Sequence, residues 1–141
     1  MTWHNPPDDA IATILRDTRR IALVGASANP ARPSAGVLRW LVGRGYAVTA
    51  VNPGLGGTLF GAPVVARLAD LAAPVDLVDV FRNSTAAGDV VDEVLALPWR
   101  PKVVWMQLGV VNPAAAARAE AAGLTVVMDR CPVIEAGRLG L

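Results

Sequence analysis

The feature that most limits the possible folds is the regular alternation of short apolar runs with segments of helical periodicity. Five runs rich in valine, isoleucine and leucine lack polar alternation, which is typical of strands buried on both faces of a parallel sheet. They cover residues 20–24, 46–51, 75–80, 102–107 and 124–128. Helical segments between successive strands favour right-handed crossovers and helices on both faces. The pattern predicts a doubly wound α/β fold with a parallel five-stranded sheet.

Helix signals lie between these runs. The predicted helices cover residues 8–17, 34–45, 66–71, 84–97 and 113–122, and residues 54–61 form a glycine-rich loop. Ser34 is the expected N-cap of the second helix. Asn112, Pro113 and Gly123 are strong boundary signals for the last helix, and the strand that follows it closes the series. Residues 1–19 are expected to form an N-terminal helical extension that packs across the sheet edge.

Length and composition favour one domain over residues 1–141 and exclude several classes of protein. Thirteen basic and twelve acidic residues give a net charge of +1. Since no basic cluster exceeds Arg19-Arg20, nucleic-acid binding is not expected. No apolar run is long enough for a membrane span and no secretory signal is present, so we expect a cytoplasmic protein. One cysteine and one histidine cannot form a disulfide or a four-ligand zinc site.

Each predicted strand ends in residues suited to a ligand. The exits begin with Gly25-Ala26-Ser27, Asn52-Pro53, Phe81-Arg82, Gln107-Leu108-Gly109 and Asp129-Arg130-Cys131. Ligands of open parallel α/β sheets bind beyond the carboxyl ends of the strands, where the strand order reverses. Polar, glycine-rich loops are common after strands, but five such exits together favour a binding site.

The loop after the first strand has the properties of a phosphate-binding turn. Gly25 permits close approach of a ligand, and Ser27 and Arg32 can donate hydrogen bonds to phosphate at the start of a helix. The G-x-G-x-x-G dinucleotide fingerprint is absent, because Ser27 and Pro30 occupy two of its glycine positions. The second strand ends at Asn52, where an NAD site would have an acidic residue. Both departures argue against NAD.

An ordered set of motifs resembles the small bacterial CoA-binding domain proteins, which are related to the N-terminal domain of the succinyl-CoA synthetase α-subunit. The motifs are Val24-Gly25-Ala26-Ser27, Arg32-Pro33-Ser34, Gly45-Tyr46, Val51-Asn52-Pro53, the run Asp76-Leu77-Val78-Asp79-Val80-Phe81-Arg82, the run from Val104 to Val110, and the run from Val126 to Cys131. The resemblance covers nearly the whole chain, and residues 54–69 follow it less closely. It implies a Rossmann-like fold and, together with right-handed crossovers, the strand order 3-2-1-4-5.

The resemblance also implies a ligand and its contacts. The ligand is coenzyme A or an acyl-CoA, with pyrophosphate at Gly25, Ala26, Ser27 and Arg32, and adenosine over Asn52-Pro53 and Phe81-Arg82. Ser34 is also expected to bind the cofactor. The arginines are the cations best placed for the 3′-phosphate that NAD lacks. Gln107 and Gly109 are expected near the pantetheine arm or an acyl carbonyl.

No catalytic machinery is predicted, and no metal ligands. His4 is expected in an N-terminal tail away from the strand ends, and succinyl-CoA synthetase chemistry needs a histidine from a second domain. Asp129 and Glu135 form no recognisable carboxylate pair, while Asp76 and Asp79 are expected to bind backbone groups. We therefore expect a stand-alone binding protein rather than an enzyme.

Several alternatives stay open. They are an NAD(P)-dependent oxidoreductase, a redox-sensing domain, and a ligase subunit that borrows its histidine from another chain. Cys131 beside Arg130 suits either a thiolate that forms a mixed disulfide with CoA or a buried, inert cysteine. Trp105 and Trp40 are expected in the core, whereas Trp3 and Trp99 suit the surface of a homodimer or of another protein partner.

Overall fold

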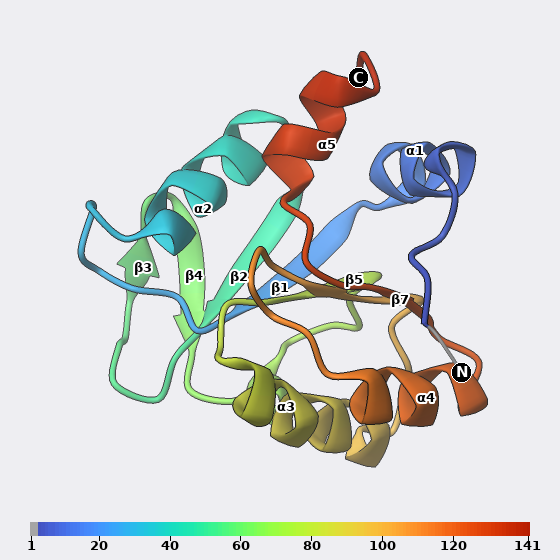
Figure 1. The fold of residues 1–141 in the computed structure, drawn as a ribbon. Helices are drawn as coiled ribbons and strands as arrows, with labels where there is room; N and C mark the ends of the chain where they lie inside the picture. The colour runs from blue at the N-terminus through green and yellow to red at the C-terminus, as the bar shows by residue number, and fades with distance from the viewer. Residues whose placement is uncertain (1–2) are drawn as a thin grey trace.

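The computed structural model describes residues 3–141 as an α/β fold built on one mixed sheet of seven strands (Figure 1). The strands are β1 (Arg20–Val24), β2 (Ala47–Val51), β3 (Thr58–Leu59), β4 (Ala62–Val65), β5 (Leu77–Val80), β6 (Val103–Met106) and β7 (Thr125–Val127). Their order is β3-β4-β2-β1-β5-β6-β7. Every neighbouring pair is parallel except β3 with β4.

The prediction of a purely parallel five-stranded sheet is therefore wrong in detail. The glycine-rich segment holds the β3–β4 hairpin, whose strands are short and carry weak apolar patterning. The predicted helix over residues 66–71 is a single 3-10 turn, η1 (Leu68–Asp70). Because β4 adds to β2, the five predicted strands have the order 2-1-3-4-5 instead of 3-2-1-4-5. With β4 included, the six parallel strands follow the Rossmann order 3-2-1-4-5-6.

Helices cover both faces of the sheet. They are α1 (Asp8–Asp17), α2 (Pro33–Gly43), α3 (Ser84–Ala96), α4 (Pro113–Ala121) and α5 (Pro132–Arg138). One hydrophobic core lies between the sheet and α3 with α4, and a second lies between the sheet and α1, α2 and α5 (Figure 1). Trp105 belongs to the second core and is fully buried, as predicted. The strands β1, β5 and β6 contribute residues to both cores, which explains their uninterrupted apolar sequences.

The two ends of the chain differ most from expectation. Helix α5, whose seven residues follow the last strand, was not predicted. The prediction that the first helix packs across the sheet edge is wrong, because Ile11 and Leu15 of α1 pack into the second core. Asp8 of α1 forms two hydrogen bonds with Arg138 of α5, at 2.9 and 2.8 Å. The N-terminal and C-terminal helices therefore lie together on one face of the sheet.

Candidate functional site

A cleft with a volume of about 620 Å³ borders the carboxyl ends of β1, β2 and β5. The strand order reverses here, because successive strands are added on opposite sides of β1. The lining residues are Val24, Gly25, Ala26, Ser27, Arg32, Pro33, Ser34, Val51, Asn52, Pro53, Ala66, Arg67, Phe81, Arg82, Val90 and Glu93. Every residue predicted to bind the cofactor is among them except Gln107 and Gly109.

Gly25 brings the loop after β1 against the end of β5. Its φ angle is +89°, and a Cβ atom there would lie 2.3 Å from the carbonyl oxygen of Phe81. The same Cβ would lie 3.2 Å from Cδ of Arg82, so this arginine side chain lies beside the loop. Glycine is required both for the positive φ angle and for the close approach.

The loop from Gly25 to α2 leaves several hydrogen-bond donors available to a ligand. The hydroxyl oxygen of Ser27 accepts a hydrogen bond from the backbone N–H of Asn29 at 3.1 Å, so the hydroxyl proton is free to be donated. Arg32, rather than the predicted Ser34, occupies the N-cap position of α2, and Ser34 lies buried in the first turn. At the start of α2, Pro33 has no N–H and the N–H of Ala35 donates to the carbonyl oxygen of Arg32 at 3.0 Å, which leaves the N–H of Ser34 for an anion at this helix terminus.

Cations dominate the charge of the cleft. Its lining contains Arg32, Arg67 and Arg82 and a single carboxylate, Glu93. Arg67 lies 3.6 Å from Asp70, whereas Arg32 and Arg82 make no ion pair within residues 3–141. Two guanidinium groups are therefore available for the oxygen atoms of a phosphorylated ligand.

Asn52 supports the loop rather than presenting its amide to the cleft. Its Nδ2 donates to the carbonyl oxygen of Ala26 at 2.6 Å, and its Oδ1 accepts from the N–H of Gly54 at 2.7 Å. A carboxylate here would place a second acceptor against the Ala26 carbonyl. Asn52 thus holds the exits of β1 and β2 together, and an NAD site would have an acidic residue at this position.

Gln107 lies away from the cleft and is almost fully buried. With its amide nitrogen turned toward Asp79, it donates to the two carboxyl oxygens at 2.9 and 3.2 Å. Burial raises the pKa of Asp79 well above its usual value. Asp79 therefore does not serve backbone groups as predicted, whereas Asp76 does, accepting from the N–H groups of Arg19 and Arg20 at 2.9 Å each.

Gly109 contacts the exit of β7 instead of the cleft. Its N–H donates to Oδ1 of Asp129 at 2.8 Å. Asp129 has a φ angle of +58°, which is uncommon for a residue other than glycine. The exits of β6 and β7 thus form a second polar region, separate from the cleft that contains Gly25.

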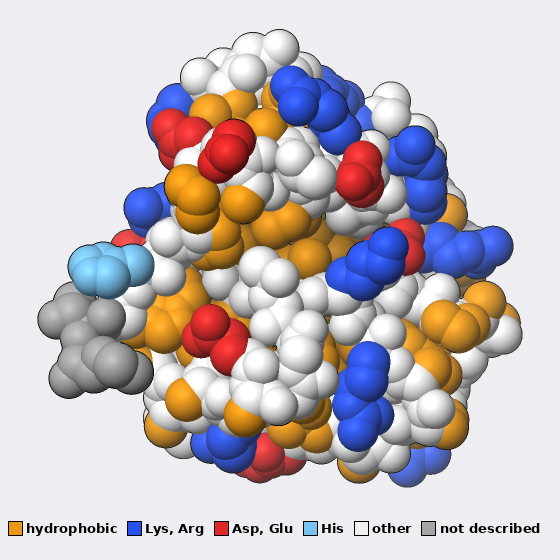
Figure 2. All heavy atoms as spheres, turned by 90° about the vertical axis from the view of Figure 1, so that its right-hand side faces the viewer, with side chains coloured by type: hydrophobic (Ala, Val, Ile, Leu, Met, Phe, Trp, Pro, Cys, Tyr) orange, Lys and Arg blue, Asp and Glu red, His pale blue; other side chains and the backbone are white. Residues whose placement is uncertain are grey.

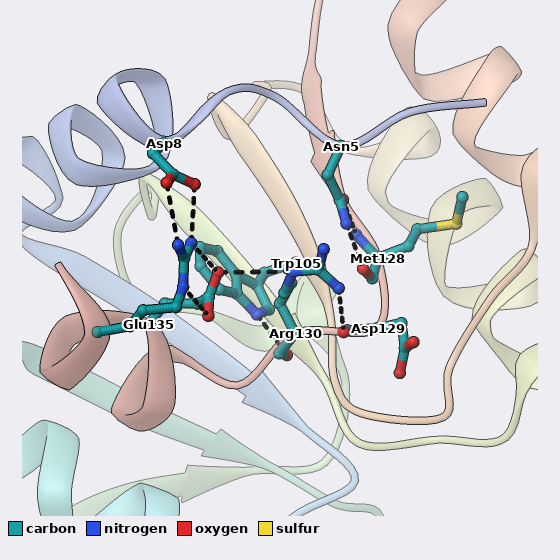
Figure 3. A network of polar contacts seen from close by, with 8 residues as sticks. Asn5, Asp8, Trp105, Met128, Asp129, Arg130 and Glu135 are labelled. Carbon is teal, nitrogen blue, oxygen red and sulfur yellow. Dashed lines mark hydrogen bonds and ion pairs between the residues drawn. The ribbon is translucent and has the colours of Figure 1, made fainter.

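The histidine and the cysteine lie near this second region. His4 does not lie away from the strand ends as predicted, because it lines a depression with Met128, Asp129 and Arg130. The side chain of Asn5 holds this segment in place through hydrogen bonds to both backbone groups of Met128, at 2.9 and 2.8 Å (Figure 3). Cys131 is buried at the N-cap position of α5, as in the inert interpretation of this residue.

One part of the cleft was not predicted from the sequence, and it is formed by Ala66, Arg67, Val90 and Glu93. The first two follow β4, a strand that was not predicted. Val90 and Glu93 are three positions apart on α3 and therefore share one face of the helix. That spacing was visible in the sequence, but the position of the face became clear only from the packing of α3.

The chain resembles known proteins over almost its full length. It is 37% identical over 127 residues to "Uncharacterized protein YneT" of Bacillus subtilis (strain 168), covering 90% of this chain and 92% of that protein. A structure described as "cell-free ID.343 from Thermus thermophilus" has a TM-score of 0.88 at 43% identity, covering 95% of this chain and 99% of that one. A "hypothetical protein from Pyrococcus horikoshii OT3" has a TM-score of 0.89 at 32% identity, with both chains fully covered.

The family comparison agrees with the motifs at the strand exits. A family model described as "CoA binding domain" matches residues 19–137, which include every strand and the whole cleft. The sequence-based resemblance to this family is therefore confirmed. The chain belongs to the CoA-binding domain family.

Proposed function

We propose that this protein is a stand-alone binding module for coenzyme A or its thioesters, and that the cleft at the exits of β1, β2 and β5 holds the nucleotide. The observation that carries the proposal is the position of Arg32, Arg82 and the start of α2 around Gly25. Coenzyme A has a pyrophosphate and a 3′-phosphate. Guanidinium groups bind such oxygens through charge-assisted hydrogen bonds, and a helix N-terminus favours anions.

The cleft lining favours binding over catalysis. Among the described residues that line it, Glu93 is the sole carboxylate, and neither histidine nor cysteine is present. Its serine hydroxyls therefore have no adjacent imidazole to activate them. Asp79 is buried away from the cleft, which makes it unsuitable as a base for a bound ligand. We accordingly propose that the module has no catalytic residues of its own.

A nicotinamide cofactor is the second candidate, because the fold is Rossmann-like. The engagement of Asn52 with Ala26 and Gly54 argues against it, since no carboxylate is available at this exit for the ribose hydroxyls. On the face shown in Figure 2, acidic and basic side chains are interspersed. No helix within residues 3–141 has the length and apolar character required to cross a bilayer.

Calorimetric titration with CoA, dephospho-CoA and NAD⁺ tests the proposal. Arg32→Ala and Arg82→Ala are each expected to weaken CoA binding about 10-fold or more, because a hydrogen bond to a charged group contributes about 1.5–3 kcal/mol. Arg16→Ala is a matched control, since it removes the same charge from α1 outside the cleft. Preferential binding of NAD⁺, or CoA binding that neither cleft variant weakens, would refute the proposal.

A further inference from the structure

Exposed apolar side chains gather at the exits of β6 and β7. Among the described residues, the exposed large hydrophobic side chains are Leu108, Ile134 and Val111, with exposed fractions of 57%, 53% and 43%. Leu108 and Ile134 line a depression of about 470 Å³ together with Cys131. Val111 lines a neighbouring depression instead. Exposed apolar groups gathered at one place indicate a contact surface.

The loop that carries Leu108 is held on both sides. Beyond the Gly109–Asp129 hydrogen bond, the N–H of Val111 donates to the hydroxyl oxygen of Ser84 at 3.0 Å. The side chain of Asn112 donates to the backbone oxygen of Ser84 at 2.9 Å. Gly109 in this loop has a positive φ angle, and so does its hydrogen-bond partner Asp129 after β7. The leucine is therefore displayed in a fixed position, and the strain at Asp129 is consistent with a functional constraint.

Four of the five charged side chains around the depression are paired with one another (Figure 3). Glu135 accepts from Arg138 at 3.0 Å and lies 3.5 Å from Arg130, while Arg138 also binds Asp8. Carboxylates outnumber guanidinium groups in the lining, because Asp129 is a third acid. No surplus cation is available, so an anionic group would be repelled and an uncharged apolar group favoured.

The depression is within reach of the cleft. Neighbouring strand exits contact one another across the sheet. Gly25 after β1 lies against Phe81 after β5, and the N–H of Gln107 after β6 donates to the carbonyl oxygen of Val80 in β5 at 3.3 Å. The carboxyl ends of β1 and β6 are two strand spacings apart, or about 10 Å. The pantetheine arm of coenzyme A contains two amide units and extends about 14 Å, like a peptide of four residues. A ligand whose pyrophosphate lies at Gly25 can therefore place its sulfur at Leu108.

On the basis of the proposed function, we infer that the depression between Leu108 and Ile134 is an acyl subsite, and that the protein selects CoA thioesters of uncharged, apolar acids. A dicarboxylic acyl group such as succinyl would be disfavoured, because its free carboxylate would meet a lining with excess negative charge.

The test compares dissociation constants for CoA, butanoyl-CoA and succinyl-CoA. The wild-type protein is expected to bind butanoyl-CoA about 5- to 10-fold more tightly than CoA, since the apolar carbons of the acyl chain leave water on binding, although only in part because this depression is partly open. Succinyl-CoA is expected to bind no more tightly than CoA. Leu108→Ser and Ile134→Ser should each reduce the preference for butanoyl-CoA at least 2-fold, and the double variant should abolish it.

Val111→Ser is the matched control, because Val111 is exposed nearby but does not line this depression. It should retain the preference. Equal binding of CoA and butanoyl-CoA by the wild-type protein, tighter binding of succinyl-CoA, or an unchanged preference in the double variant would overturn the inference while leaving the proposed function intact. A change of oligomeric state in Leu108→Ser with no change in acyl preference would assign this surface to a second copy of the chain. Failure to bind CoA at all would refute both proposals.

Discussion

Replacing Gly25 with alanine tests how the cleft is built. The substitution adds a Cβ atom 2.3 Å from the carbonyl oxygen of Phe81 at a residue whose φ angle is +89°. The left-handed conformation costs an L-residue about 1–2 kcal/mol. Relieving the overlap requires the loop and the end of β5 to separate, for which an overpacked site typically loses about 1–3 kcal/mol. Together these effects predict a loss of about 3 kcal/mol in the free energy of unfolding.

Urea and thermal unfolding measure this loss. For a chain of this length, about 3 kcal/mol corresponds to a fall in Tm of about 10 °C. Gly123→Ala is the matched control, since Gly123 has a φ angle of +90° but no atom near its hypothetical Cβ. It should lose only the conformational part, about 1–2 kcal/mol. Equal losses in the two variants would refute the argument that close packing of Phe81 against Gly25 forms the cleft.

Three further substitutions test other parts of the account. Asn52→Asp should lower the free energy of unfolding by about 1–3 kcal/mol in urea titrations at pH 7, because the Ala26 carbonyl loses its donor and faces a carboxylate; unchanged stability would contradict this role. Asp79→Asn should remove a pH dependence of the free energy of unfolding. Because burial raises the pKa of Asp79, the stability that its protonated form contributes is complete below pH 3.8 and is lost as the pH rises through the folded-state pKa. The slope is up to about 1.4 kcal/mol per pH unit. Urea titrations from pH 4 to pH 8 measure this slope, and identical pH profiles for variant and wild type would refute the assignment. Glu93→Gln should tighten CoA binding about 2- to 5-fold at low salt, and by less in 0.5 M salt, because it removes a negative charge from the cleft; titrations that show no salt-dependent gain would contradict this.

The sequence predicted those parts of the fold that depend on local pattern. The strands that became β1, β2, β5, β6 and β7 were identified because burial on both faces requires continuous apolar runs. Asn112 caps α4 as predicted, accepting from the N–H of Ala115 at 3.0 Å. Features set by tertiary contact were missed. The β3–β4 hairpin is stabilised by pairing with β2, and its own residues carry little strand signal.

The candidate site shows the same division. Gly25, Arg32 and Arg82 were chosen because each follows a strand exit, and the strand order brings these exits together. The error in strand order did not change the position of the site. In the predicted order and in the observed order alike, the reversal occurs at the first strand, β1. Gln107 does not line the cleft, and sequence position alone does not show which way a side chain turns at a strand end. Its buried partner, Asp79, lies on the adjacent strand.

The most direct test of the central claim is an NMR titration of ¹⁵N-labelled protein with CoA, which reports on every backbone N–H at once. The account predicts that the largest shift changes occur at Gly25, Ser27, Arg32 and Arg82, with smaller changes along the exits of β6 and β7. The residues of the β3–β4 hairpin that lie outside the cleft should be unaffected. Shift changes confined to another surface, or none at saturating CoA, would contradict the claim that the cleft at the strand reversal is the binding site.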